Sequence, residues 1–148
     1  MANQTTYSQY QPAGFPGMSA DMAEWDGRTR IAQSTIAFGA PVQRNGNMGC
    51  DPLTTGEYIG IAAARHLVTG NGDTYVQYDN VPVVDEGVWF GIADAPITVG
   101  TALNWNSGTG RWTTATGAGI YPVPQSEAEI AASAAGALFK VRLRRIPS

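Results

Sequence analysis

Apolar and polar residues alternate along much of the chain, which is the pattern of half-buried β-strands. In residues 35–42, Ile36, Phe38 and Val42 fall at even spacing on one face. The segments between the alternating runs are rich in Gly, Pro, Asn and Asp, which favour turns. The pattern predicts strands at 35–42, 57–68, 74–79, 88–93 and 97–99, a hairpin at 101–114, a last strand at 137–145, and a long loop at 44–56.

The hairpin at 101–114 is the clearest local prediction. Residues 106–110 supply a turn, and Trp105 and Trp112 lie symmetrically about it, so we expect the two rings to face each other across the strands. Such an aromatic pair contributes about 0.5–1.5 kcal/mol beyond the area that it buries. We interpret the pair as pinning the hairpin. The alternative is an exposed platform on which a ligand stacks.

Residues 125–137 fit two structures. Ser126 and Glu129 have the spacing of a helix capping box, and the Ala-rich run that follows has a high helix propensity. As strands, residues 128–133 and 137–145 would instead form a hairpin around a turn at 134–136. The local sequence favours the helix.

The last strand carries a basic stripe. Its alternation places Phe139, Val141 and Leu143 on one face and Lys140, Arg142 and Arg144 on the other. Residues 138–148 hold four basic side chains and no acid, so the rest of the chain, with a total of −3, carries −7. This asymmetry suits an electrostatic match between like subunits or with a partner, although a solvated strand face would have the same pattern.

The first 30 residues have the character of an extended arm. They are polar, contain Pro and Gly, and lack periodicity, yet they include more large side chains than a disordered tail usually has. These side chains are Tyr7, Tyr10, Phe15, Met18, Met22 and Trp25. We expect residues 1–30 to dock on their own domain or on a neighbour, which leaves residues 31–148 as a single domain.

Composition supports an all-β architecture. The chain has 148 residues with 18 Gly and 9 Pro, and only 14% of its residues are charged, against roughly 25% in ordinary domains. Frequent turns favour strands over helices. The scarcity of charge indicates that a partner covers part of the surface.

No residue pattern indicates catalysis. Cys50 and His66 are the only residues of their types, which excludes a disulfide framework and clustered Cys or His metal sites, and we interpret both as structural. The Gly-x-Gly sequences lack the context of a phosphate-binding loop. Asn71, Asp73 and Asp79 could surround calcium, but their spacing is not that of an EF-hand and suits turns. We therefore predict no catalytic residue, cofactor or metal.

Other classes of partner are also disfavoured. No apolar run approaches the 18 residues of a membrane span, and the first residues lack the features of a secretory signal, so we expect cytosolic synthesis. The negative net charge argues against nucleic acid as the partner.

An ordered set of segments resembles the cement, or decoration, proteins that bind the outside of tailed-bacteriophage capsids. Each segment alone is a weak motif, and their order over nearly the whole chain carries the resemblance. The segments are GFPGMSAD at 14–21, IAFGAPV at 36–42, YIGIA at 58–62, ITVG at 97–100, AAGAL at 134–138 and KVRL at 140–143.

The resemblance implies a compact β-barrel or jelly-roll-like sandwich and a non-enzymatic structural role in the virion. It implies a homo-oligomer, a dimer or trimer, that binds the capsid exterior at junctions between major capsid proteins. It also favours the hairpin at 125–137, although Glu127 and Glu129 depart from the family pattern there. The candidate subunit or capsid contacts are Tyr7, Tyr10, Phe15, Met18, Trp25, Lys140, Arg142 and Arg144. The alternative function is a β-sandwich glycan-binding module that uses Trp105 and Trp112.

Overall fold

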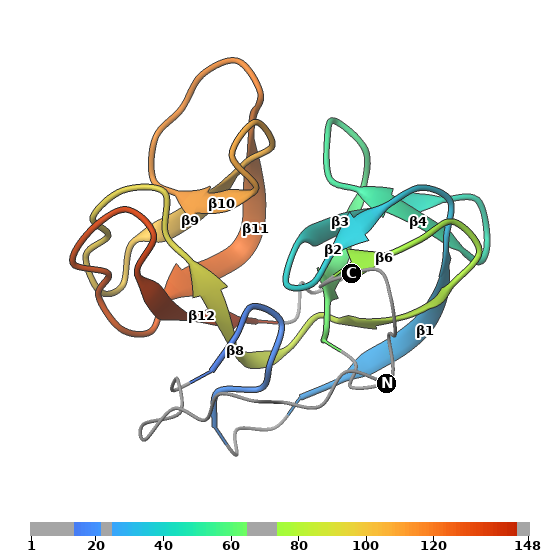
Figure 1. Cartoon of the computed structure of the whole chain (residues 1–148), viewed down its shortest axis with the longest axis horizontal. Coiled ribbons are helices and arrows are strands. Elements are labelled where there is room, and N and C mark those ends of the chain that lie inside the picture. Colours follow the sequence, from blue (N-terminus) through green and yellow to red (C-terminus); the bar gives the residue numbers. More distant parts are fainter. Residues whose placement is uncertain (1–13, 22–24, 65–73, 145–148) are drawn as a thin grey trace, which may run out of the picture.

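A computed structural model describes residues 14–21, 25–64 and 74–144, and all regular structure in them is β (Figure 1). The strands are β1 Gly27–Ala32, β2 Ile36–Ala37, β3 Pro41–Asn45, β4 Gly49–Pro52, β5 Tyr58–Ala62, β6 Thr74–Tyr75, β7 Asn80–Val84, β8 Gly87–Ile92, β9 Ala102–Asn106, β10 Arg111–Thr113, β11 Ile120–Ala128 and β12 Leu138–Leu143. The all-β prediction is confirmed. No helix among the described residues is long and apolar enough to cross a membrane.

The first half of the chain forms a small closed barrel. Its strand order is β1-β4-β3-β5-β7, and β7 pairs with β1 to close it. Tight closure requires a glycine in β5, because a Cβ at Gly60 would lie 2.4 Å from the carbonyl oxygen of Val84, and its φ is 143°. β2 and β6 form a separate two-stranded sheet beside the barrel.

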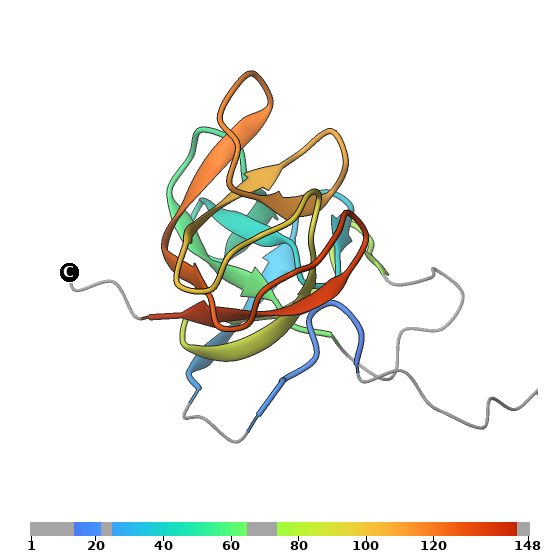
Figure 2. The same cartoon turned by 90° about the vertical axis from the view of Figure 1, so that its left-hand side faces the viewer.

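The second half forms a five-stranded sheet with the order β10-β9-β11-β12-β8 (Figures 1 and 2). β12 pairs along its whole length with β8, and β11 pairs with both β9 and β12. A parallel bridge between Ala93 and Trp112 brings the chain after β8 against β10, so the two ends of this sheet approach each other.

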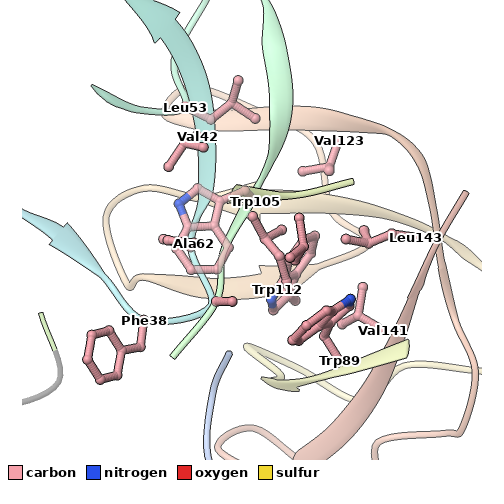
Figure 3. Packing of buried hydrophobic residues seen from close by; sticks show 14 of the residues in the cluster. Phe38, Val42, Leu53, Ala62, Trp89, Trp105, Trp112, Val123, Val141 and Leu143 are labelled. Carbon is pink, nitrogen blue, oxygen red and sulfur yellow. The ribbon is translucent and has the colours of Figure 1, made fainter. Parts of the chain in front are cut away.

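One apolar core joins the barrel and the second sheet. Buried side chains from the two parts belong to a single cluster, and Figure 3 shows Val42 and Ala62 of the barrel together with the tryptophans of the second sheet. Trp105 and Trp112 are register partners, as predicted, and their rings meet edge to face with centroids 5.4 Å apart.

Four predicted strands are shorter or more broken than the pattern indicated. Of the described part of 57–68, only Tyr58–Ala62 is a strand, and 97–99 contains no strand but a single bridge at Ile97. Residues 35–42 are not one strand, because Gly39 adopts a φ of 78° and separates β2 from β3. The run at 74–79 is a strand only over Thr74–Tyr75, because the chain turns immediately afterwards. The predicted long loop at 44–56 contains β4, which completes a hairpin with β3.

The local prediction of a helix at 125–137 is wrong. β11 continues to Ala128, where it pairs with Val141 of β12, and residue Ala132 then bridges to Ile97. The alanines at 128 and 132 are buried in the core, so tertiary packing overrides their helix propensity. The hairpin pairing implied by the resemblance is present, but its first strand ends at Ala128 instead of beginning there.

Candidate functional site

The described residues contain no site with the features of a catalytic or metal centre. No group of three or more His, Cys, Asp or Glu side chains in this part of the chain could hold a metal ion. Cys50 is buried in β4, and burial, followed by the neighbouring Asp51, raises the pKa of its thiol to about 11. A protonated, buried thiol is a poor nucleophile, which supports the structural interpretation of Cys50. His66, Asn71 and Asp73 lie outside the described residues.

The paired tryptophans cannot serve as a stacking platform. Trp105 exposes 6% of its surface and Trp112 exposes 2%. A sugar ring stacks only on an exposed aromatic face, so this observation removes the residue basis of the glycan-binding alternative. The interpretation that the pair pins its hairpin is confirmed by the register and the ring contact.

Part of the arm docks on its own domain as an added strand. Gly17 N donates to the carbonyl of Phe90 at 3.0 Å, and Ala20 N donates to that of Val88 at 2.9 Å. Phe90 N donates in return to the carbonyl of Met18, and Ser19 bridges to Trp89 in antiparallel fashion. The edge of β8 that β12 leaves free is therefore paired with the arm segment, drawn in blue beside β8 in Figure 1.

The same arm segment reaches the barrel. Ala64 N, just beyond β5, donates to the carbonyl of Gly17 at 2.8 Å. Gly17 and Gly39 lie so close that a Cβ on either would be 2.7 Å from the backbone nitrogen of the other. Gly14 leaves similarly little room over the ring of Phe90. The arm thus connects the second sheet to the barrel.

The other predicted contact residues of the arm remain on or near the surface. Phe15 is 37% exposed and Met18 is half-buried. Trp25 is 59% exposed, and its ring meets that of the buried Trp89 edge to face, with 6.1 Å between centroids. Tyr7 and Tyr10 lie outside the described residues.

The basic stripe of β12 has the predicted alternation, and two of its side chains are ion-paired to β11 and its continuation. Arg142 Nη1 lies 3.4 Å from Glu129 Oε2, and Arg144 Nη2 lies 2.5 Å from Glu127 Oε1. These pairs are partly exposed, so they are weak. Among the described residues, Lys140 has no such ion pair. The stripe is therefore partly neutralised by the acids that depart from the family pattern.

Sequence reasoning missed five large apolar side chains that the fold leaves exposed. They are Met48, Val76, Tyr78, Val99 and Ile130. All five lie in connections between strands. The sequence predicts a loop around Met48, strands around Val76, Tyr78 and Val99, and a helix around Ile130.

The fold is all-β, and the part of the chain that the structure describes assembles no cluster of side chains suited to hold a metal. The family described as "Structural cement protein (E217 gp24/Pam3 gp6)" matches residues 3–144. The chain belongs to this family of phage structural cement proteins.

A solved structure shows the same fold. A chain from "The capsid of Myoviridae Phage XM1" superposes with a TM-score of 0.78 at 18% sequence identity, and the match covers 99% of this chain and 100% of that chain. No curated protein sequence matches this chain significantly. The family establishes a structural role in the phage capsid, association with the capsid, and a place in the virion.

Proposed function

We propose that the protein binds the outer surface of an assembled tailed-phage capsid, at junctions between major capsid proteins, and stabilises the shell as a homo-oligomer without catalysis. The observation that carries this proposal is the set of large apolar side chains left exposed on a sparsely charged chain, among them Trp25, Met48 and Tyr78. Exposed aromatic and Met side chains with few charges around them are typical of protein interfaces.

The stabilisation follows from linkage. A protein that binds the assembled lattice, and not the free subunit, shifts the equilibrium toward the lattice by mass action. Many copies held in symmetry multiply a modest contact through avidity. Neither effect requires a reactive group.

The arm supplies a second set of contacts in this proposal. Residues 14–20 are engaged with β8 and the barrel, so the candidate residues Tyr7 and Tyr10 precede a fixed anchor. We expect this first stretch of the chain to reach capsid protein or a neighbouring copy.

The test is sedimentation of the full chain with undecorated shells, combined with the mass of the free protein in solution. We expect saturable binding, a higher disassembly temperature of decorated shells, and a dimer or trimer mass. A chain that lacks residues 1–13 retains the arm segment paired with β8 and should keep its fold but bind more weakly. Binding of disassembled capsid subunits as tight as binding of shells would contradict the proposal.

A further inference from the structure

The turn at residues 76–79, between β6 and β7, exposes a tyrosine from a backbone conformation that tyrosine rarely adopts. Tyr78 has a φ of 73° and is 72% exposed, the largest exposure among the exposed large apolar side chains of the described residues. The left-handed region is a marked outlier for a bulky side chain, and Gly or Asn usually occupies this position of a turn. Val76, in the same turn, is 36% exposed.

The turn is held firmly from within. Asp79 N donates to the carbonyl of Val76 at 3.1 Å, and Asp79 Oδ2 accepts a hydrogen bond from Val76 N at 2.9 Å. Tyr78 N donates to the carbonyl of Ala32 at 2.7 Å, and Ala32 N donates to the carbonyl of Asp79 at 2.9 Å. On the preceding strand, the buried Tyr75 packs against Phe38 with ring centroids 4.9 Å apart. The side chain of Tyr78 is therefore presented from a fixed backbone.

Folding alone does not account for a tyrosine at this position. The ring is mostly exposed, so it adds little to the core, and the backbone hydrogen bonds of the turn would be the same for Asn or Gly. Strained residues that persist in a well-held turn are found at functional sites. Tyrosine is also among the residues that contribute most to binding at protein interfaces.

We propose that Tyr78 is an anchor residue that inserts into a shallow apolar depression on a capsid protein, with a hydrogen-bonding group at its rim for the phenol. This inference rests on the proposed function and adds one defined contact to it. The turn lies at the right-hand end of the barrel in Figure 1, away from the blue segment of residues 14–21, so this contact is separate from that segment.

Area favours capsid protein over a second copy of the chain as the occupant. A stable protein pair buries about 800 Å² on each partner, whereas a buried aromatic side chain contributes only about 150–250 Å². A four-residue turn with one tyrosine and one partly exposed valine thus forms a weak contact by itself. Weak contacts are effective when many copies bind one lattice, as a cement protein does.

The experiment compares the full chain with Tyr78→Asn and Tyr78→Phe for sedimentation with undecorated shells. Gln77→Ser, in the same turn, is the matched control for an exposed polar side chain. We expect Tyr78→Asn to weaken shell binding at least about tenfold while its unfolding midpoint stays equal or rises, because Asn suits the left-handed backbone. Tyr78→Phe keeps the ring and should lose only a few-fold, and Gln77→Ser should bind like the original chain.

The outcomes separate this inference from the proposed function. Shell binding by Tyr78→Asn equal to that of the original chain overturns the inference and leaves the function standing. A Tyr78→Asn chain whose solution mass falls to that of a monomer overturns it in favour of a second copy as the occupant. Failure of the original chain to bind shells overturns the proposed function, and the inference with it.

Discussion

Gly17 and Gly39 pass each other at a distance that leaves no room for a side chain on either. A Cβ at Gly17 would lie 2.7 Å from Gly39 N and 2.9 Å from Ala64 N, and the φ of Gly17 is 80°. We expect Gly17→Ala to detach the arm from β8 and the barrel. The measurement is hydrogen exchange at Phe90 N and Ala64 N, whose bonds to the arm would open.

Gly100 provides the control for this variant. Its φ of 79° matches that of Gly17, but nothing lies within 4 Å of the Cβ that an alanine would add. Gly100→Ala should lower the free energy of unfolding by about 1–2 kcal/mol, the cost of an L-residue in this region, with unchanged exchange at Phe90 N. Equal exchange in both variants would show that the close approach is not what holds the arm.

Cys50 makes stability depend on alkaline pH. Its pKa is raised from an ordinary 9.0 to about 11 by burial and, secondarily, by Asp51. The folded chain therefore binds this proton more tightly than the unfolded chain, so the contribution is complete below about pH 9 and is lost as pH rises toward 11. We expect the free energy of unfolding to fall over this range more steeply than in Cys50→Ala. Parallel pH profiles of the two chains would contradict the assignment.

For single residues, the sequence predicts which side chains are partners across strands and which face of a strand each occupies, but it does not predict unusual backbone conformations. The symmetric spacing of Trp105 and Trp112 about a turn is enough to predict that they are register partners. The positive φ of Tyr78 could not be predicted, because the alternation of Thr74 to Asp79 resembles a strand and nothing in the residue type signals a left-handed turn.

Among the elements, β12 combines a buried face with a charged one, and the charged face can be tested separately. Replacing Lys140, Arg142 and Arg144 with Gln should weaken subunit or capsid contacts at about 0.15 M salt. The reason is that the substitution removes the electrostatic attraction across the interface, which salt screens only in part at this concentration. The free energy of unfolding should change little, because the two ion pairs are exposed and each contributes about 0–1 kcal/mol.

A second triple variant controls for the change in net charge. Replacing Arg28, Arg30 and Arg44 with Gln removes the same number of positive charges, three, but from the barrel. Shell sedimentation should be weakened by the β12 variant and not by the barrel variant. Equal shell binding by both triple variants would show that the basic side chains of the stripe form a solvated strand face and make no contact with a partner.

The hairpin of β11 and β12 shows why a strand can be predicted as a helix when the local helix propensity is strong. Ser126, the expected helix cap, is buried, and its hydroxyl donates to the carbonyl of Val123 at 2.7 Å. This hydrogen bond lies within an irregular stretch of β11, where the register with β9 shifts between Pro122 and Glu127. The competing information lies in strands far along the chain, which a local pattern does not contain.

For the molecule as a whole, the shared core predicts that the barrel and the second sheet unfold together. Three of the four tryptophans lie in the second sheet, and the fourth, Trp25, contacts Trp89 of that sheet, while Cys50 lies in the barrel. Tryptophan fluorescence therefore reports mainly on the second sheet, and labelling of Cys50 reports on the barrel. We expect the loss of native tryptophan fluorescence and the gain of Cys50 labelling to share one denaturant midpoint. Two separated midpoints would show that the parts fold independently.

The closure of the barrel and the order of strands in the second sheet lay beyond sequence reasoning. The all-β class and the frequent turns could be inferred from local patterns and composition. The parallel pairing of β1 with β4, and the antiparallel pairing of β7 with β1, depend on contacts between residues far apart in the chain. Non-local pairings of this kind leave no periodic signal in either partner.

The arm segment on β8 also has a consequence for the free chain in solution. An unpaired strand edge is a template on which other chains polymerise, and sheet proteins avoid this by covering their edges. Here residues 17–20 cover the edge of β8 within the same molecule. The chain can therefore accumulate to high concentration without this edge seeding aggregates.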